Sequence, residues 1–486
     1  MGPTHSIPAG SLTVDSRALQ TFVDRLWDDA ILPALADYVR IPNKSPAFDA
    51  QWQAHGFMDQ AVALAAAWCQ AQAPAGATVE VRRLPGRTPL LCVDVPATDP
   101  ARTDTVVLYG HLDKQPEFTG WREGLGPWQP VRREERLYGR GAADDGYAVF
   151  ASLAALRALE AQSVPHARCL IIAECCEESG SYDLPHYIDE LGDAMGEVSL
   201  VVCLDAECGN YEQLWCTSSL RGNLTGVLEV AVMREGVHSG AAGGIVPDSF
   251  RLLRQLMERI ESGESGELRP QALHAAIPEE RRRQMREAAA ALGESVYAKF
   301  PFVEGAGPGE RDPAELIARN TWGPALAVTG ANGLPAVADA GNVLRPATRV
   351  KLSFRLPPTL DPAPAAEAVK RALETDPPNG AHVRFRVEGT MAGWNAPAVA
   401  PWLAHAMQAA SRAHFGKPAL YMGTGGSIPF MGFLARRFPR AQFLVSGVLG
   451  PHSNAHGPNE FLHIPTAKHV TACVAEVVAA HARRAP

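Results

Sequence analysis

Residues 106–113, which read Val-Val-Leu-Tyr-Gly-His-Leu-Asp, constrain the fold of this chain more than any other stretch. The apolar run that opens the stretch predicts a buried strand, which ends at the glycine. Side chains two residues apart in an extended chain point to the same side, so His111 and Asp113 place an imidazole beside a carboxylate. Ligands bind at strand ends in α/β sheets, which makes the pair a candidate site, although it also fits a surface histidine and a loop aspartate.

Other predicted strands also lead to acidic residues. Apolar runs at 106–110, 167–173 and 198–204 each precede at least one carboxylate. The candidate polar residues on these strand ends and the adjoining loops are His111, Asp113, Asp144, Glu177, Glu178, Asp205 and His456. Each acid alone fits a turn or a helix cap, and a glutamate pair is usually solvated. Their repeated position after strands nevertheless predicts that they share one site.

Histidine nitrogen and carboxylate oxygen are ligands for borderline divalent metals. Two histidines with four or five carboxylates suffice for two ions bridged by one carboxylate. Such a pair of ions clamps an oxyanion and lowers the pKa of a bridging water, and the reaction then needs a base for the water's proton. Glu177 and Glu178 could divide the roles of ligand and base between them, and the residue pattern leaves open which is which. Zinc is the ion we expect, with manganese or cobalt as alternatives.

The length of 486 residues predicts two domains. Alternating strand patterns at 224–234 and 347–358, with helical patterns between them, predict a smaller α+β domain. The pattern before and after it is that of an α/β sheet flanked by helices. The simplest architecture therefore inserts residues 219–390 into a catalytic domain made of residues 1–218 and 391–486.

Charge and cysteine content exclude several classes of protein. The net charge of −8 argues against a nucleic-acid partner, which needs clustered lysine and arginine. Nine cysteines without a Cys-X-X-Cys pair predict a reducing, cytoplasmic setting rather than a disulfide framework. Residues 1–20 show no secretory signal pattern, and no apolar run approaches the 18 residues of a membrane span, so we expect no membrane association.

Six short motifs together resemble a known family. GHLDKQPE, YGRGAADD, EESGS, VHSG, GGSIP and AHGPNE occur in this order. The set resembles the co-catalytic di-metal peptidases that include carnosinase, cytosolic non-specific dipeptidase, aminoacylase and succinyl-diaminopimelate desuccinylase, and it is most similar to the carnosinase and dipeptidase branch. The resemblance implies a zinc-peptidase α/β domain interrupted by a smaller lid and dimerisation domain. That organisation agrees with the insertion predicted above.

The resemblance also implies roles for the metal-site residues. His111 and Asp205 would hold one ion, Glu178 and His456 the other, and Asp144 would bridge the two. In the same way, the resemblance makes Asp113 the residue that orients the histidine ligand. It makes Glu177 the general base, which serves a hydroxide that bridges the metals.

Four further residues are implied on the substrate side. His238 would reach into the active site of a partner subunit and bind the carbonyl oxygen as charge builds there, so the resemblance implies a homodimer. Asn342 would be a second residue that reaches the partner's site. Arg355 would grip the carboxylate of a small peptide substrate, for which a planar guanidinium is suited, and Ser427 would contact the substrate from a glycine-rich turn.

The sequence departs from the dipeptidase pattern at three places, which involve four residues. Gly423 and Thr424 stand where Arg-Glu is common, Gly146 stands where a lysine usually follows the aspartate pair, and Asn342 replaces a threonine. All three changes lie near the substrate rather than at the metals. We therefore expect metal-dependent hydrolysis of the amide bond of dipeptides or short peptides with a free carboxylate. An N-acyl-amino-acid amidohydrolase and a non-catalytic metal- or peptide-binding protein are the alternatives.

Overall fold

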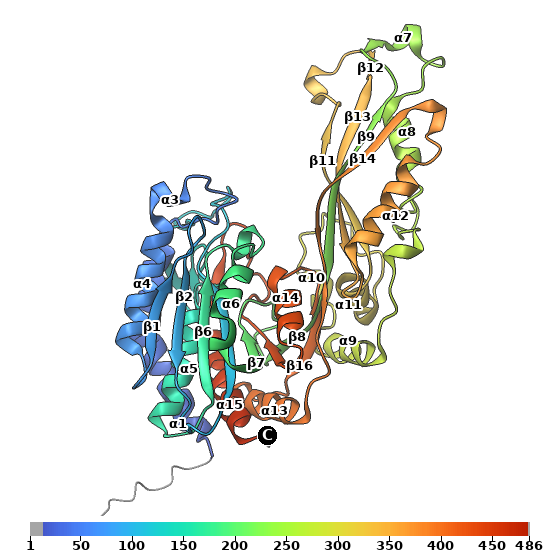
Figure 1. Ribbon diagram of the computed structural model, residues 1–486. Coiled ribbons are helices and arrows are strands. Elements are labelled where there is room, and N and C mark those ends of the chain that lie inside the picture. The colour runs from blue at the N-terminus through green and yellow to red at the C-terminus, as the bar shows by residue number, and fades with distance from the viewer. Residues whose placement is uncertain (1–12, 485–486) are drawn as a thin grey trace, which may run out of the picture.

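The computed structural model describes residues 13–484, and a six-stranded mixed sheet forms its larger half (Figure 1). In spatial order the strands are β1 (Thr78–Arg82), β2 (Leu90–Val95), β6 (Arg168–Glu174), β3 (Asp104–His111), β7 (Glu197–Cys203) and β17 (Gln442–Val445). Strands β6, β3, β7 and β17 run parallel to one another, whereas β2 runs antiparallel to both of its neighbours, β1 and β6. Residues 1–12 lie outside the described residues, and they make up most of the N-terminal segment, residues 1–20, in which we predict no secretory signal.

Strand β3 lies between β6 and β7 and is buried on both faces, which explains its continuous apolar sequence. Val106 and Leu108 pack in the larger core, and Val107 and Tyr109 pack in a second core on the opposite face. The helices of the larger core are α1 (Ser16–Leu26), α2 (Leu32–Val39), α4 (Phe57–Gln72), α5 (Ala148–Ala161), α13 (Pro401–Phe415) and α15 (Ile464–Arg483). Those of the second core are α6 (Leu184–Leu191) and α14 (Pro429–Arg437).

A separate four-stranded antiparallel sheet, called the second sheet below, extends away from the first (Figure 1). Its strands, in spatial order, are β11 (Ala325–Asn332), β13 (Ala347–Leu356), β9 (Gly222–Ala231) and β14 (His382–Met391). Strand β9 alternates strictly between buried and half-buried residues, because α8 (Ser249–Met257) and α12 (Pro362–Glu374) share a core with one face of the sheet. A mixed α/β sheet with a separate antiparallel sheet confirms the predicted fold class.

Two small three-stranded sheets and several short elements complete the fold. Strands β15 (Trp394–Asn395), β8 (Trp215–Leu220) and β16 (Leu420–Thr424) form one small sheet, and β18 (Phe461–His463), β5 (Arg136–Tyr138) and β4 (Val131–Arg133) form another. The remaining elements are β10 (Val237–His238), β12 (Val343–Leu344), α3 (Trp52–His55), α7 (Ser239–Ala242), α9 (Glu279–Leu292), α10 (Ser295–Ala298) and α11 (Pro313–Thr321). Strands β8, β11 and β16 were not expected from the sequence, where serine, threonine and glycine interrupt their apolar pattern.

The segment between residues 279 and 322 packs away from the second sheet. Met285 and Ala288 of α9 and Ile317 of α11 share a hydrophobic cluster with Trp215 of β8. This segment lies within the predicted insertion, residues 219–390, yet it covers the small sheet of β8 and β16. The boundaries of the inserted domain, residues 219 and 390, therefore remain a prediction.

The nine cysteines are all free and buried. Eight of them lie in the hydrophobic cores, whereas the Cys176 thiol donates to Oε2 of Glu174 at 3.4 Å. Within residues 13–484, no helix is both long enough and apolar enough to cross a lipid bilayer.

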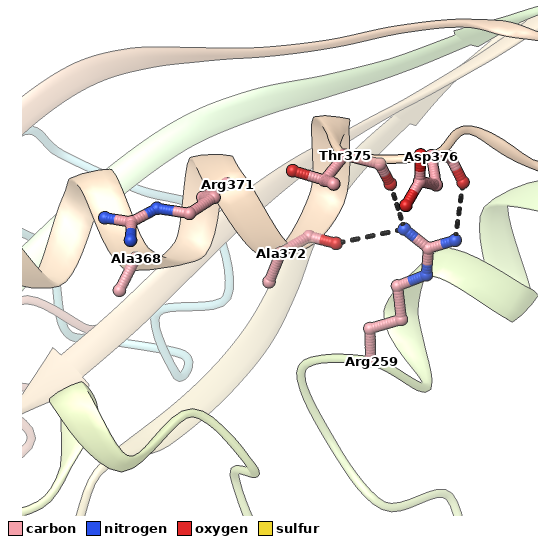
Figure 2. Close-up of a pocket in the computed structure, with 6 residues that line it drawn as sticks. All are labelled: Arg259, Ala368, Arg371, Ala372, Thr375 and Asp376. Atoms are coloured by element: carbon pink, nitrogen blue, oxygen red, sulfur yellow. Dashed lines mark hydrogen bonds between the residues drawn. The ribbon is translucent and has the colours of Figure 1, made fainter.

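Arg259, which follows α8, joins this helix to the end of α12 (Figure 2). Its guanidinium donates hydrogen bonds to the carbonyl oxygens of Ala372 at 3.2 Å, Thr375 at 2.6 Å and Asp376 at 2.8 Å. The last carbonyl groups of a helix have no partner within the helix, and a cation there also interacts favourably with the helix dipole. Arg259 therefore stabilises the layer of helices that covers the second sheet.

We expect Arg259→Met to lower the free energy of unfolding by about 1–3 kcal/mol, because hydrogen bonds from a charged donor are lost. Urea unfolding measures the total effect, and hydrogen exchange of the α12 amides tests its location. Arg254→Met, at an exposed position of α8, is the matched control and should change little. Equal stability of the two variants would contradict this role of Arg259.

Candidate active site

The carboxyl ends of three parallel strands bring the predicted site residues together. His111 is the last residue of β3, Asp205 lies two residues beyond β7, and Glu177 begins a short 3-10 turn beyond β6. Because β6, β3 and β7 are parallel neighbours, these residues meet at one edge of the sheet.

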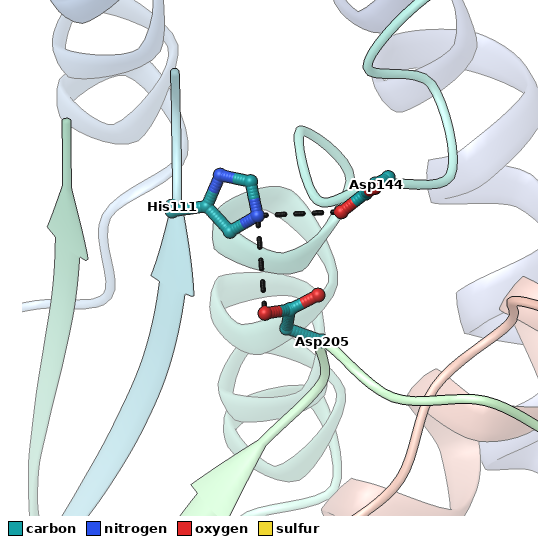
Figure 3. A group of neighbouring side chains, drawn as sticks. All are labelled: His111, Asp144 and Asp205. Carbon is teal, nitrogen blue, oxygen red and sulfur yellow. Dashed lines mark ion pairs between the residues drawn. The ribbon is translucent and has the colours of Figure 1, made fainter. Parts of the chain in front are cut away.

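His111, Asp144 and Asp205 form a first cluster of buried side chains (Figure 3). The Nε2 atom of His111 lies 3.4 Å from Oδ1 of Asp144 and 3.9 Å from Oδ2 of Asp205. One ligand atom from each residue lies within 4.8 Å of the other two, which is close enough for one ion to contact all three. The three residues come from a strand end, a glycine-rich turn and a second strand end.

Asp144, Glu178 and His456 form a second cluster, and Asp144 is common to both. The Nε2 atom of His456 lies 3.0 Å from Oδ2 of Asp144 and 3.4 Å from Oε2 of Glu178. The Glu178 side chain is 3% exposed, whereas that of His456 is 57% exposed. The second cluster therefore opens towards solvent on its histidine side.

The residues of both clusters fit divalent metal ions. Nε2 of His111 and Oε1 of Glu178 are buried without a hydrogen-bond partner among the described residues. Burial and the charge of Asp144 raise the pKa of Glu178 to about 8, and burial with neighbouring charges also raises the pKa of Asp205. A shared carboxylate between two sets of oxygen and nitrogen donors, crowded by like charges, suits a pair of cations.

Asp113 orients both His111 and the glutamate pair. The Nδ1–H group of His111 donates to the carbonyl oxygen of Asp113 at 3.0 Å, so Nε2 keeps its lone pair towards the first cluster. The Asp113 carboxylate accepts hydrogen bonds from the backbone N–H groups of Glu177 at 3.1 Å and Glu178 at 3.0 Å. Asp113 thus links the end of β3 to the turn that carries both glutamates.

A buried ion pair, which sequence reasoning missed, supports the second cluster. The guanidinium of Arg140 donates to Oε2 of Glu460 at 2.6 Å and to the carbonyl oxygen of Gly457 at 2.7 Å. Oε1 of Glu460 accepts from the backbone N–H groups of Gly141, Ala143 and Asp144. The pair therefore joins the Asp144 turn to the loop that carries His456. Its only sequence signal is two opposite charges inside the YGRGAADD and AHGPNE motifs.

A cavity of about 1150 Å³ opens beside the two clusters. Asp144, Asp205 and His456 of the clusters line it. Glu177, which belongs to neither cluster, lines it as well, and burial with the charge of Asp205 raises the pKa of this glutamate. The predicted substrate residues Arg355 and Ser427 also line the cavity, and Nη1 of Arg355 donates to Oγ of Ser427 at 3.4 Å.

His238 and Asn342 lie elsewhere. His238 is exposed in β10, which pairs with β12, and the backbone N–H of Ser239 donates to the carbonyl oxygen of Asn342 at 2.9 Å. Figure 1 shows α7, which follows His238 directly, at the end of the second sheet far from the first sheet. Neither residue lines the cavity of its own chain.

The sequence profile of Peptidase family M20/M25/M40 matches residues 107–480. The chain belongs to this family. The matched segment contains all five cluster residues and Glu177. The di-metal peptidases that the six sequence motifs resemble belong to this same family. This M20 peptidase is a metallopeptidase with dipeptidases among its relatives.

Two curated relatives are dipeptidases. The cysteinylglycine-S-conjugate dipeptidase of Corynebacterium striatum is 27% identical over 381 residues, which cover 76% of this chain and 80% of the relative. The beta-Ala-His dipeptidase of Homo sapiens is 29% identical over 288 residues, or 57% of this chain and 54% of the relative.

Solved structures share the fold over nearly the whole chain. Human carnosine dipeptidase 1 superposes with a TM-score of 0.75 at 20% identity and covers 97% of this chain and 100% of that one. The dipeptidase Dug1p from Saccharomyces cerevisiae also has a TM-score of 0.75, at 19% identity, with 97% and 99% covered. At this level of identity the likeness concerns the fold.

We expect Glu460→Asp to weaken zinc binding by this M20 peptidase about 10- to 100-fold, because the shortened carboxylate withdraws from the amides of the Asp144 turn. Competition with a chromogenic chelator measures the affinity. Glu476→Asp shortens a carboxylate that contacts Ser16 and His414 instead, and should bind zinc as wild type does. Unchanged affinity in Glu460→Asp would show that the ion pair does not position the ligands.

Proposed function

We propose that this M20 peptidase hydrolyses the amide bond of dipeptides or short peptides that carry a free carboxylate. The main support for this proposal is the pair of ligand clusters that share Asp144, with Glu177 beside them in one cavity. The dipeptidase names of both curated relatives support this reaction. Arg355, which lines the same cavity, supports a substrate with a carboxylate.

The proposed metal sites follow the two clusters. His111 and Asp205 would hold one ion, Glu178 and His456 would hold the other, and Asp144 would contribute to both sites. When bound, two such ions, which we expect to be zinc with manganese or cobalt as alternatives, polarise a carbonyl group and lower the pKa of a water molecule between them. Asp113 keeps Nδ1 of His111 protonated and its Nε2 directed at the site.

Glu177 is the proposed general base. It lines the cavity but lies outside both ligand clusters, so its carboxylate is available for proton transfer. Its backbone is held by Asp113, at a turn whose next residue is a proposed ligand. Glu177 takes the proton of the attacking water and delivers it to the leaving amine.

Arg355 and Ser427 bind the free carboxylate of the substrate in this proposal. Arg355 extends from the end of β13, and Ser427 lies in the glycine-rich turn after β16. Oγ of Ser427 accepts from Nη1 of Arg355, and the serine hydroxyl donates to the backbone carbonyl oxygen of Arg221, so the serine is held beside the guanidinium. A substrate carboxylate accepts from the remaining N–H groups of Arg355 and, once the hydroxyl turns away from Arg221, from Ser427, which fixes the end of the substrate relative to the clusters.

We further propose that residues 219–390 act as a lid and dimerisation domain inserted into the catalytic residues 1–218 and 391–486. His238 and Asn342 lie together at the end of the second sheet, away from their own cavity, which supports action in a partner subunit. There His238 stabilises the developing oxyanion and Asn342 contacts the substrate. A cytoplasmic location is proposed because all nine cysteines are free thiols.

One observation favours a second substrate class. Gly423 and Thr424 line the cavity, and they carry no carboxylate to pair with the free amino group of a dipeptide. An N-acyl amino acid lacks that amino group and would use the same metals and the same Glu177. The amidohydrolase is therefore the alternative reaction.

Removal of metal should abolish hydrolysis, and zinc or manganese should restore it. The assay compares EDTA-treated protein, before and after metal addition, on simple dipeptides and on N-acetyl amino acids. We expect Glu177→Gln to lower kcat by at least about 100-fold while zinc binding stays intact, since only proton transfer is lost. Cleavage of N-acetyl compounds alone would favour the amidohydrolase. Zinc and peptide binding without turnover in the wild type would favour a binding protein.

Subunit mixing tests the role of His238. His238→Ala alone should lower kcat about 100- to 1000-fold with a smaller change in KM, as for the loss of an oxyanion donor. When His238→Ala and Glu177→Gln subunits are dissociated together and reassociated, mixed dimers contain one site with both residues intact if His238 acts in trans. Recovered activity supports this arrangement. No recovery, despite mixed dimers seen by mass spectrometry, means that His238 does not act across the interface.

A further inference from the structure

A second arginine, which unlike Arg355 is buried, lies beside the proposed carboxylate site. Arg221 stands at the junction of β8 and β9, is 6% exposed, and lines the same cavity as Arg355. Its Nε donates to the carbonyl oxygen of Gly425 at 3.0 Å and its Nη1 to that of Gly323 at 3.1 Å. These two bonds hold the guanidinium plane in place and leave Nη2 for another partner.

The lack of a side chain at Gly425 lets this arginine approach the backbone closely. A Cβ atom at Gly425 would lie 3.1 Å from Nη2 of Arg221 and 2.9 and 3.0 Å from the two amide atoms of Asn320. Asn320 is in α11 and also lines the cavity. Arg221 and Asn320 therefore approach the glycine-rich turn at one point, a short distance along the chain from Ser427.

The charges around this turn do not balance. Within residues 13–484, neither Arg221 nor Arg355 has a carboxylate oxygen within 4.0 Å, the limit for an ion pair. Burial and the charge of Arg355 lower the pKa of Arg221 to about 10, and the charge of Glu207 opposes this. Lys299 also lines the cavity and interacts with Glu207. Arg221 and Arg355 therefore each lack a paired carboxylate, whereas an ordinary peptide carboxylate supplies one negative charge.

We propose that the residue on the carboxyl side of the scissile bond is acidic, so that the leaving amino acid carries two carboxylates. This inference rests on the proposed function. The α-carboxylate binds Arg355 and Ser427, and the side-chain carboxylate accepts from Nη2 of Arg221 and from the Asn320 amide. Two carboxylates neutralise the two uncompensated charges. An amide side chain of the same shape would leave a buried guanidinium without its counter-ion.

Matched peptides test the proposal. The ratio of kcat/KM for Ala-Glu to that for Ala-Gln should be at least about 10, because a site built for a charged partner rejects the neutral isostere. In Arg221→Met this ratio should fall towards one, whereas Arg355→Met should lower kcat/KM for both peptides. Arg349→Met, which removes an exposed arginine paired with Glu229 on the second sheet, controls for the loss of a cation and should keep the wild-type ratio. A wild-type ratio near one overturns the proposal and leaves the proposed hydrolysis in place.

Arg221→Met also removes two hydrogen bonds to the backbone, so a milder variant is needed in case it misfolds. Asn320→Ala keeps the arginine and removes the second donor. It should lower the Ala-Glu to Ala-Gln ratio several-fold, with circular dichroism and the melting temperature unchanged. An unchanged ratio in a folded Asn320→Ala, together with an unchanged ratio in a folded Arg221→Lys, overturns the assignment.

Binding of the products separates this inference from the reaction itself. Isothermal titration calorimetry of the wild type with L-glutamate and with L-glutamine needs no turnover. Tighter binding of L-glutamate, lost in Arg221→Met or Asn320→Ala, supports the second carboxylate site even if no peptide is cleaved. In that case only the proposed hydrolysis fails. Equal binding of the two amino acids, or none, overturns the site.

Discussion

The central constraint on this structure is the crowding of carboxylates at one edge of the larger sheet. Asp144, Asp205 and Glu178 converge on two histidines, and like charges in a poorly solvated place repel one another. Within residues 13–484 no lysine or arginine forms an ion pair with these three acids. These carboxylates are held together more easily when positive charge lies among them, and the proposed pair of divalent cations would supply it.

Two nearby buried cations are already engaged. Arg140 is paired with Glu460, and the ammonium group of Lys114 donates to the carbonyl oxygens of Tyr38 and Ile41. Their hydrogen bonds shape the backbone around the clusters and do not neutralise the clusters. The side chains of Arg140 and Lys114 are thus kept away from the carboxylates of the proposed metal site. This separation preserves the affinity of those carboxylates for external cations.

The supporting hydrogen bonds run largely through the backbone. Tyr147 donates to the carbonyl oxygen of Leu204, next to Asp205, and Tyr38 donates to that of Leu112, between His111 and Asp113. The acceptors Asp113 and Glu460 are bonded to backbone N–H groups of the turns that carry Glu178 and Asp144. Such bonds fix the turns themselves, so the ligand side chains start from defined positions.

The sequence by itself determined the parallel strands and the acids that follow them, because continuous apolar runs and adjacent polar residues are local patterns. It therefore predicted the fold class and brought His111, Asp144 and Asp205 together as candidates. It did not determine strands β8 and β16, whose serine, threonine and glycine residues are buried only by tertiary packing. Only the tertiary structure decided that Glu460 supports Asp144 and that Arg221 faces Gly425 and Asn320, because those partners lie between about 100 and 320 residues apart. A contact across that separation depends on how whole layers pack, and no local pattern in the chain encodes it.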